Sequence, residues 1–404
     1  GASRTLALPN AHVRHLFVTV DYPPDLGGMA RRHVELCRRL ANEGVTVSTV
    51  AATGAQRFDQ AEPYRIAREP FTFRGARTVF NRWRWARSIA QCAPETDVIH
   101  CGNIRPCGYA VLIARRRARG PRPFLLYVNG SDLLREREKI TASGLKRWFV
   151  RQLFSQAAGI VANSAWTAET AWTLCEALGV DPGDRVAAID LGTDPAQFRR
   201  ENDKGRLRAS LGWQQLCVAV TVARLVPHKG QDMALRAVAA VVREYPDLRY
   251  LIVGDGPNES ALRRLASDLG IADRVAFAGS LTDEEVAEAY ATADIYLGLS
   301  RQDGVDVEGF GISFVEAAAS GLPVIAGDSG GVRSAVRDGE TGIIVRPNDC
   351  DAVAAALRRL LVDAIRRREM GNAGRRAVET HYNWDRVARE TAALAERAVR
   401  VTRA

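Results

Sequence analysis

The chain has 404 residues, of which 47% are hydrophobic and 25% charged, and its formal net charge is +9 at pH 7. This length is too great for one ordinary core, so we expect two domains of about 200 residues each. No apolar run reaches the roughly 18 residues that a membrane-spanning helix needs, so the composition is that of a soluble globular protein and excludes the membrane-embedded classes.

The N-terminal half alternates short apolar runs with polar or Gly-rich loops. Its predicted strands are residues 15–20, 45–50, 97–100, 124–128, 159–162 and 186–189. Residues 21–28 contain paired prolines and paired glycines, so this segment is a loop rather than a helix. Residues 29–42 then show helical periodicity. A strand, a Gly-rich loop, a helix and a second strand predict a doubly wound nucleotide-type domain, which we place at residues 1–195.

A polar stretch at residues 195–214 predicts a linker or hinge, and a second set of alternating elements follows it. We expect helices at residues 233–245, 360–379 and 384–403, and strands at residues 217–222, 248–253, 275–279, 295–298, 323–326 and 342–345. The second domain is therefore placed at residues 196–383. Two α/β halves leave a cleft between them, and such sheets bind ligands at the carboxyl ends of their strands.

One segment of the second half combines two acids with a Gly-rich turn: Glu308-Gly-Phe-Gly-Ile-Ser-Phe-Val-Glu316. A helix is expected to begin near Ile312, which places Gly309, Phe310 and Gly311 at its positive end. Free backbone N–H groups at such an end can hold a phosphate. Glu308 precedes that end, and Glu316 lies about one turn inside the helix. The alternative is a buried strand–helix unit with two solvated acids.

Two cations, Arg224 and Lys229, follow the predicted strand at residues 217–222. Together with a Gly-rich helix start they would neutralise a diphosphate without a metal ion. The alternative is an exposed pair with no ligand. Because both this loop and the 308–316 segment follow strands, we expect them to converge on the cleft.

At this point the chain resembles a known family. Three segments occur in order: Val222-Ala-Arg-Leu-Val-Pro-His-Lys-Gly230, Val253-Gly-Asp-Gly-Pro257, and residues 308–316 with the Ala-Ser-Gly-Leu-Pro-Val-Ile that ends at Ile325. They resemble the C-terminal half of the retaining GT-B glycosyltransferases of family 4. The likeness extends to Gly27-Gly28, Asn163-Ser164 and Leu191-Gly-Thr-Asp194. The segment Asp306-Val-Glu-Gly-Phe-Gly311 is particularly similar to bacterial phosphatidylinositol mannosyltransferases that use GDP-mannose.

The resemblance implies an α/β protein of GT-B fold, with two Rossmann-like domains facing a cleft and a final helix that crosses back to the first. It implies a retaining transferase that moves a hexose from GDP-mannose or a UDP-hexose to a hydroxyl acceptor, either anionic or lipid-linked. No cofactor, no metal and no nucleic-acid partner are expected. A GT-B-fold phosphorylase or nucleotide-sugar epimerase is the alternative enzyme. A non-enzymatic basic surface-binding protein fits the intact donor motifs poorly.

Roles for single residues also come from this resemblance. Arg224 and Lys229 would bind the donor diphosphate, Glu308 would bind the sugar hydroxyls, and Glu316 would accept from the ribose hydroxyls. The remaining donor-binding candidates are backbone or loop positions: Gly27, Gly28, Gly254, Asp255, Gly256, Gly309, Phe310, Gly311 and Ile312. In the two paired-glycine positions the missing side chain would let the backbone approach the phosphates closely.

One departure from the family lies at Asn129-Gly-Ser-Asp132, where many relatives carry His-Gly-x-Asp/Glu. An asparagine can donate a hydrogen bond to a sugar hydroxyl but cannot titrate near neutral pH. Asn129 therefore stays a site candidate without a protonic role. Asp132 is either an acceptor-side base or a helix cap. His100, at a strand end, is either an acceptor-side group in the cleft or a packed core histidine.

The positive charge is concentrated in the N-terminal half. Residues 1–195 hold 27 Lys+Arg against 18 Asp+Glu, an excess equal to the net charge of the whole chain. Residues 74–87 and 146–151 mix arginines and lysine with aromatic side chains. This composition suits an anionic membrane surface or a phosphorylated acceptor. The alternatives are ordinary amphipathic helices and a solvated, Arg-rich surface.

The seven cysteines are scattered and form no CxxC pair, which favours reduced thiols over a disulfide framework or a zinc site. No cleavable signal peptide is visible at the start of the chain. Gly1-Ala2-Ser3 has the composition of a cloning remnant, in which case native targeting residues are missing. We expect a cytoplasmic protein that is either free or peripheral at the inner face of the membrane.

Overall fold

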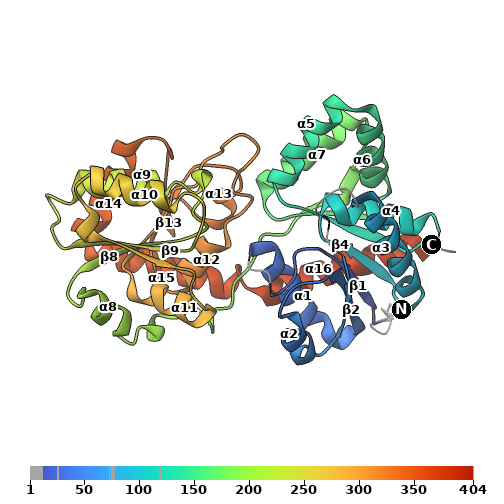
Figure 1. Ribbon diagram of the computed structural model, residues 1–404, viewed down its shortest axis with the longest axis horizontal. Coiled ribbons are helices and arrows are strands. Elements are labelled where there is room, and N and C mark those ends of the chain that lie inside the picture. The colour runs from blue at the N-terminus through green and yellow to red at the C-terminus, as the bar shows by residue number, and fades with distance from the viewer. Residues whose placement is uncertain (1–11, 25–26, 72, 74–77, 118–120, 404) are drawn as a thin grey trace, which may run out of the picture.

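Two parallel sheets form the two halves of the molecule, which lie side by side in Figure 1. The computed structural model describes residues 12–24, 27–71, 73, 78–117 and 121–403. Within these residues the first sheet has the strand order β3-β2-β1-β4-β5-β6-β7, and the second has the order β10-β9-β8-β11-β12-β13. Helices cover both faces of each sheet, as parallel sheets require. The predicted GT-B architecture is confirmed.

The N-terminal sheet follows the predicted strands closely. Its strands are β1 (His15–Val18), β2 (Val45–Val50), β3 (Arg65–Glu69), β4 (Val98–Cys101), β5 (Phe124–Val128), β6 (Gly159–Ala162) and β7 (Val186–Ala188). Its helices are α1 (Gly28–Gly44), α2 (Ala55–Ala61), α3 (Thr78–Cys92), α4 (Tyr109–Arg115), α5 (Ser131–Ala142), α6 (Gly144–Gln156) and α7 (Ala165–Leu178). Strand β3 was not predicted, because this edge strand is polar and only half-buried.

The C-terminal half contains the second sheet. Its strands are β8 (Cys217–Val222), β9 (Leu248–Val253), β10 (Val275–Gly279), β11 (Ile295–Gly298), β12 (Val324–Gly327) and β13 (Gly342–Val345). Its helices are α8 (Arg206–Leu211), α9 (Gln231–Val241), α10 (Glu259–Asp268), α11 (Asp283–Thr292), α12 (Ile312–Ala319), α13 (Val332–Ala335), α14 (Cys350–Val362) and α15 (Ala364–Thr380). The helix predicted at 360–379 is instead the end of α14 followed by α15. The break lies at Asp363, whose carboxylate caps α15 by accepting from the Arg366 amide at 2.8 Å.

The predicted linker is more ordered than its composition suggests. Residues 200–202 form a short 3₁₀ turn, and α8 follows. The Arg208 side chain then fixes this stretch to the second sheet, with hydrogen bonds of 3.0 Å to both the Thr292 carbonyl and the Asp294 carboxylate. The stretch from residue 200 onward therefore packs on the second sheet.

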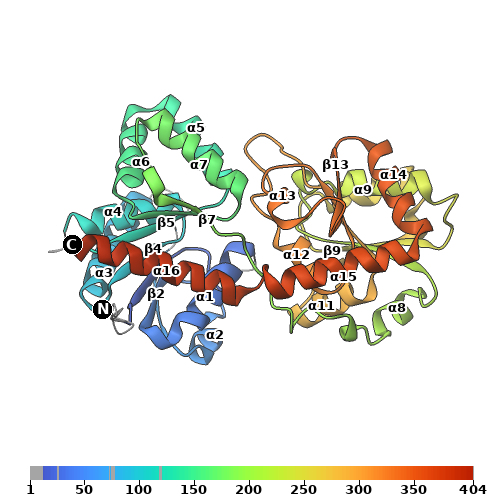
Figure 2. The ribbon, with the colours of Figure 1, turned by 180° about the vertical axis from the view of Figure 1, so that it is seen from behind.

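The last helix, α16 (Trp384–Arg403), returns to the N-terminal half, and Figure 2 shows it running along the back of that domain. Ion pairs fix both of its ends, from Arg39 to Asp385 at 2.6 Å and from Arg403 to Asp97 at 2.8 Å. Its apolar face is buried. The predicted crossing helix is confirmed. In the part of the chain that the structure describes, no helix has both the length and the apolar content needed to cross a bilayer.

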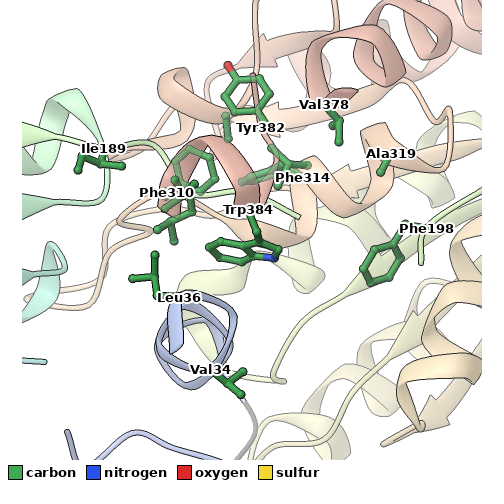
Figure 3. Close-up of a cluster of buried hydrophobic side chains, with 14 of the residues drawn as sticks. Val34, Leu36, Ile189, Phe198, Phe310, Phe314, Ala319, Val378, Tyr382 and Trp384 are labelled. Atoms are coloured by element: carbon green, nitrogen blue, oxygen red, sulfur yellow. The ribbon is translucent and has the colours of Figure 1, made fainter. Parts of the chain in front are cut away.

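An apolar cluster joins the two halves beside the cleft. Figure 3 shows Trp384 at its centre, with Leu36 of α1 and Phe310 of the loop before α12 close by. The three side chains are at most 2% exposed. Because Phe310 lies in this cluster, the Gly-rich loop that contains it is fixed against the N-terminal domain. The cluster thus positions the loop on which the candidate site depends.

Candidate active site

Two adjoining cavities lie between the carboxyl ends of the two sheets. One, of about 440 Å³, is lined on the N-terminal side by residues that include Asn129, and we call it the Asn129 cavity. The other, of about 330 Å³, contains Glu316 and is called the Glu316 cavity. Seven residues line both: Gly27, Gly28, Arg224, Lys229, Glu308, Gly311 and Ile312. All seven are among the site residues proposed from the sequence.

The Gly-rich loop presents its backbone to these cavities because of its local geometry. Gly311 precedes α12 with a φ of 92°, and a Cβ atom there would lie 2.3 Å from the Phe314 ring. Glycine is therefore required at this position. The loop amides stand at the positive end of α12, where they can bind an anion. Phe310 contributes its backbone, since its side chain is buried in the cluster between the domains.

The two predicted cations differ in their surroundings. The Lys229 ammonium lies 2.5 Å from the Glu308 carboxylate, which also accepts from the Ser300 hydroxyl at 3.3 Å. Burial raises the pKa of Glu308, but the Lys229 charge and its hydrogen bond outweigh burial, and the pKa lies below its ordinary value. Arg224 is exposed, and its side chain has no ion pair among the described residues. The site thus holds one paired cation and one that is free to meet an anion.

Glu316 lies at the far end of the second cavity and is 8% exposed. Its carboxylate accepts a hydrogen bond from the Tyr290 hydroxyl at 2.9 Å and lies 3.8 Å from the Arg31 guanidinium. Burial raises the pKa of Glu316 despite these partners. Arg31 comes from α1 and also pairs with Asp283 at 2.8 Å. It is a site residue that the sequence did not reveal.

Glycines at the start of α1 and after β9 allow neighbouring segments to approach the backbone closely. Gly27, with a φ of 152°, precedes α1, and a Cβ on Gly28 would lie 3.2 Å from Ile312 of α12. The N-termini of α1 and α12 therefore face each other across the cavities. Gly254 has a φ of 124° and lines the Glu316 cavity, and a Cβ there would lie 2.2 Å from the Ala223 carbonyl.

Two predicted neighbours of Gly254 do not line either cavity. Asp255 is exposed and accepts a hydrogen bond from the Ser280 hydroxyl. Gly256 packs against the loop that follows β8, where a Cβ would lie 2.3 Å from the Leu225 carbonyl. The contacts of Asp255 and Gly256 are with neighbouring loops of the protein. These two residues therefore fix the shape of the loop that carries Gly254.

The N-terminal side of the Asn129 cavity is formed where β5 meets α5. The Asn129 side-chain oxygen accepts from the Arg32 guanidinium at 3.3 Å. One oxygen of Asp132 accepts from the backbone amides of Asn129 and Leu133 at 2.9 and 2.8 Å. Asp132 thus binds these amides from within the first turn of α5, whose N-cap is Gly130, and it also lines the cavity. Its burial raises the pKa of this carboxyl to about 6.

His100 is not at the cleft, and the packed-core alternative is the one that the structure shows. Its ring is 1% exposed and stacks on Phe17 with a centroid distance of 4.1 Å. Its two nitrogens lie 2.9 Å from the His15 ring and 2.8 Å from the Tyr127 hydroxyl. Burial holds the pKa of His100 well below its ordinary value. The sequence left both alternatives open, because a strand's side chains alternate between its two faces and the sequence does not say what packs against each face.

Direct contacts between the domains close one side of the cleft. Ser131 exchanges hydrogen bonds with the backbone of Val307, at 3.1 Å from its amide and 3.2 Å to its carbonyl. Arg135 pairs with Asp306. The Thr167 hydroxyl donates to the Gly309 carbonyl at 3.3 Å. Sequence reasoning missed Ser131 and Arg135, since their partners lie more than 170 residues away in the chain.

In the described part of the chain, no three His, Cys, Asp or Glu side chains gather as a metal-binding group would. The groups available to bind a diphosphate are cations and backbone amides. Such a set can stabilise the negative charge that develops on a leaving phosphate.

Two models of known protein families match this chain. The family model described as "Glycosyltransferase Family 4" matches residues 26–197, and the model "Glycosyl transferases group 1" matches residues 203–377. Together they cover both halves of the chain.

Relatives match over nearly the whole length. The chain is 33% identical to the GDP-mannose-dependent alpha-(1-6)-phosphatidylinositol monomannoside mannosyltransferase of Mycolicibacterium smegmatis, covering 91% of this chain and 94% of that protein. The enzyme of the same name from Mycobacterium tuberculosis H37Rv is 34% identical, with 94% and 97% covered. A Corynebacterium glutamicum mannosyltransferase with a monoacylated acceptor is 30% identical, with 93% and 96% covered.

Solved structures agree on the fold. Anabaena HepE in complex with UDP and glucose has a TM-score of 0.76 at 21% identity, covering 95% of this chain and all of that one. A glycosyltransferase from Rickettsia africae has a TM-score of 0.78 at 18% identity, with 96% and 98% covered. The family models, the full-length relatives and the two facing sheets lead to one conclusion: this chain belongs to the family-4 glycosyltransferases of GT-B fold and is a hexosyltransferase.

Proposed function

We propose that this enzyme transfers mannose from GDP-mannose to a hydroxyl group of a phosphatidylinositol mannoside lipid, with retention of configuration and without a metal ion. The observation that carries the proposal is the near-full-length identity of 30–34% to enzymes named for this donor and this class of acceptor. The geometry of the cleft supports it, because cations, amides and carboxylates stand where a nucleotide sugar would need them.

Each group has a proposed role in donor binding. Arg224 and Lys229 hold the diphosphate together with the amides before α12, and Gly27 and Gly28 let the backbone of α1 approach it from the opposite side. Glu316 accepts from the ribose hydroxyls, and Glu308 accepts from those of the sugar. The Asn129 cavity, next to Glu308, then receives the hexose and the acceptor hydroxyl.

The chemistry follows from this placement. The bond between the sugar's anomeric carbon and the phosphate oxygen breaks, and a bond to the acceptor oxygen forms on the same face. The proton of the acceptor hydroxyl passes to the departing phosphate oxygen. Arg224, Lys229 and the end of α12 stabilise the charge on that phosphate, and preorganised groups of this kind contribute several kcal/mol each. The contacts of Ser131 and Arg135 across the cleft exclude water, which would otherwise hydrolyse the donor.

A donor screen tests this function. Thermal-shift measurements with GDP- and UDP-sugars, followed by native mass detection of the bound species, are expected to select GDP-mannose. Labelled mannose should then pass to phosphatidylinositol monomannoside in a chelator-treated assay. Selection of a UDP-hexose would contradict the proposed donor, and activity that depends on added divalent metal would contradict the metal-free mechanism.

An exposed surface of aromatic and basic side chains on the N-terminal domain supports the lipid acceptor. Phe80 and Trp83 of α3 and Leu145 and Trp148 of α6 are 61%, 46%, 69% and 40% exposed, and we call these four residues the aromatic ridge. Two arginines after α4, which packs against both helices, lie over its tryptophans: Arg117 over Trp83 at 4.4 Å and Arg116 over Trp148 at 5.0 Å. Exposed aromatics beside arginines suit the interface of an anionic bilayer. We propose that the ridge makes the enzyme's peripheral membrane contact.

Two parts of the predicted basic surface are not in this ridge. Trp85 is fully buried, and its indole N–H donates to the Ser48 hydroxyl at 2.8 Å, so it cannot meet a membrane. The Trp85 side chain points from α3 towards the sheet. The mixture of arginines and aromatics in the sequence did not indicate this orientation. Arg74 and Arg77 lie outside the described residues.

A further inference from the structure

A third cavity, of about 670 Å³, lies on the C-terminal domain outside the cleft. It is lined by residues 199–201 of the predicted linker, by the end of α12 and by α15, and we call it the linker cavity. Figure 2 shows α15 on the back of this domain. None of its lining residues lines either cavity of the cleft. Its volume is typical of sites for small organic molecules, so it is a separate candidate site.

Positive charge dominates the lining of this cavity. Five arginines face three carboxylates there: Arg199, Arg200, Arg367, Arg368 and Arg375 against Glu201, Asp294 and Glu379. Two of the carboxylates are already engaged, Glu379 with Arg375 at 2.6 Å and Asp294 with Arg208 at 3.0 Å. Among the described residues, three of the lining arginines (Arg199, Arg367 and Arg368) have no ion pair, whereas Glu201 is the one lining carboxylate without one.

Two of the arginines build the walls of the cavity. The Arg375 guanidinium donates to the carbonyls of Phe198 and Ala319, both at 2.7 Å, and so joins the linker to the end of α12. The Arg367 guanidinium donates to two carbonyls in the last turn of α14, at 2.6 and 3.2 Å. The Arg199 and Arg368 side chains, in contrast, are exposed and have no hydrogen bond to the described residues. These two cations are therefore available to a ligand.

A buried hydroxyl group in the same lining lacks a partner. Ser320 is the C-cap of α12 and is 1% exposed, and its Oγ atom has no hydrogen-bond partner in the described part of the chain. The last four carbonyls of α12 already accept from backbone amides or from Arg375, so the negative end of this helix does not require a cation. A buried hydroxyl without a partner destabilises the folded state. It therefore indicates an acceptor atom that binds in the cavity.

The chemistry of these free groups selects an anion. Arg199, Arg368 and the Ser320 hydroxyl are hydrogen-bond donors, and the planar fork of an arginine matches the oxygens of a phosphate. A cation would be repelled by the arginines. The free carboxylate of Glu201 opposes an anion, so the ligand needs more than one negative charge to bind well. A ligand with two or more phosphate charges meets this requirement.

We propose that the linker cavity binds a small ligand with two or more phosphate charges, which Arg199, Arg368 and the Ser320 hydroxyl contact. The ligand is either a free phosphorylated molecule or the headgroup of a phosphorylated lipid. Helix α12 separates it from the cleft, with Gly311 at one end and Ser320 at the other, and its eight residues span about 12 Å. The inference uses neither the proposed donor nor the proposed acceptor, so each can fail without the other.

Pyrophosphate is the probe, and the double variant Arg199→Ala/Arg368→Ala tests the site. The matched control Arg359→Ala/Arg376→Ala removes the same charge from exposed positions of α14 and α15 that line none of the three cavities. None of the four side chains has an ion pair in the described residues, so both variants should keep the wild-type Tm. Because the cleft also offers cations to a diphosphate, the cleft is first saturated with GDP, or with UDP if UDP binds more tightly.

Isothermal titration of pyrophosphate into these proteins gives the Kd. The wild type should bind one pyrophosphate, and the Kd should rise about tenfold or more in the test variant, which corresponds to about 1.4 kcal/mol of lost binding. The control variant should keep the wild-type Kd. Ser320→Ala should raise the Kd several-fold, while its Tm without ligand stays at or above that of the wild type, because an unpartnered hydroxyl has been removed.

Flotation with phosphatidylcholine vesicles that contain phosphatidylinositol 4-phosphate distinguishes the two sources of the ligand. For a lipid headgroup, the floating fraction should fall in Arg199→Ala/Arg368→Ala and not in its control. For a free molecule, the two variants should float equally while their Kd values for pyrophosphate differ. The inference is overturned if the nucleotide-saturated wild type binds no pyrophosphate, or if the test and control variants lose the same affinity. An unchanged Kd in Ser320→Ala would contradict it as well.

Discussion

The two sides of the cleft differ in how far their polar groups are satisfied; we call the lining residues of the second domain the C-terminal wall and those of the first the N-terminal wall. On the C-terminal wall Lys229 pairs with Glu308, and Glu316 accepts from Tyr290, so that among its charged site residues the exposed Arg224 stands without an ion pair in the described residues. On the N-terminal wall, buried atoms of Arg32 and Asp132 have no protein partner in the described residues. A wall with its own internal pairs can hold its shape before any ligand arrives. The buried atoms of the N-terminal wall reach their full set of hydrogen bonds with a ligand or with ordered water.

This difference suggests a division of labour. In the donor arrangement proposed above, the C-terminal wall carries the cations and the helix end that bind the diphosphate and stabilise its charge. In the same arrangement, the N-terminal wall contacts the hexose and the acceptor. Variants on the two walls should therefore differ in kind: the first group should lose turnover with any substrate, and the second should lose selectivity.

The largest effect is expected from Glu308→Ala. It removes the carboxylate that holds Lys229 and accepts from the sugar, so kcat should fall by about 10²–10³-fold, as when one preorganised group is removed from a closed site. The Tm should fall, because the mostly buried Lys229 ammonium loses its ion-pair partner and Ser300 loses its acceptor, so turnover is compared at a temperature where both proteins are folded. Steady-state transfer assays and thermal unfolding measure both quantities.

Glu340→Ala is the control for that experiment, since Glu340 is an exposed glutamate of the same domain whose ion pair among the described residues is with Arg337. It should keep wild-type turnover. If Glu308→Ala also keeps wild-type turnover, the assignment of the C-terminal wall as the catalytic one is wrong.

The second effect concerns nucleotide affinity. Glu316→Gln removes the charge that is proposed to accept from the ribose, and hydrogen bonds to charged groups contribute about 1.5–3 kcal/mol, so the Kd of GDP should rise by at least about tenfold. Folding should be preserved, because burial already disfavours the charged form of this carboxyl. Isothermal titration with GDP gives the Kd. An unchanged value would remove Glu316 from the nucleotide site.

The sequence revealed the C-terminal wall more fully than the N-terminal one, for a physical reason. Glu308, the Gly-rich loop and Glu316 are contiguous, and the helix geometry that joins them is local. Arg31 and Arg32 are neighbours of equal charge at the start of a helix, and nothing in the sequence distinguishes their two side chains. Only the fold shows that Arg31 reaches Asp283 and Glu316 while Arg32 is buried over Tyr127.

The same reasoning explains two side chains whose surroundings the sequence left open. The core position of His100 depends on what packs against its face of β4, and the buried position of Trp85 depends on which face of α3 meets the sheet. Both are decided by contacts distant in sequence, with His15 and Ser48 respectively. The strands of the two sheets other than the polar edge strand β3 were predictable, since they are apolar runs whose signal is local.

A smaller effect, on pH dependence, separates the two walls further. Burial raises the pKa of Asp132 from its ordinary value to about 6. Between about pH 4 and pH 6 the folded state therefore binds more protons at this group than the unfolded state does, so its contribution to the free energy of unfolding falls as the pH rises. Asp132→Asn should remove that dependence and, at pH 7, stabilise the protein by about 3 kcal/mol.

Chemical unfolding of the wild type and Asp132→Asn at pH 5 and pH 7 measures this effect. The difference in the free energy of unfolding between the two proteins should be larger at pH 7. Equal differences at both pH values would show that Asp132 does not titrate in this range. Glu308 should contribute little to the change in the free energy of unfolding between pH 5 and pH 7. Its pKa is lowered in the folded state, and its carboxyl is largely ionised in both the folded and the unfolded state over this range.

The smallest effect is expected far from both walls. The double variant Trp83→Ala/Trp148→Ala removes two side chains of the aromatic ridge, each of which is less than half exposed. The fraction of protein that floats with anionic phosphatidylinositol vesicles should therefore fall several-fold. Hydrolysis of the nucleotide sugar in free solution should be unchanged, because the ridge lines neither cavity. Trp172→Ala, which removes a 40% exposed tryptophan on α7, is the matched control. If the double variant loses hydrolysis along with vesicle binding, the ridge is coupled to the cleft and the membrane contact is more than an anchor. If vesicle binding persists, lipid acceptors reach the N-terminal wall by another surface.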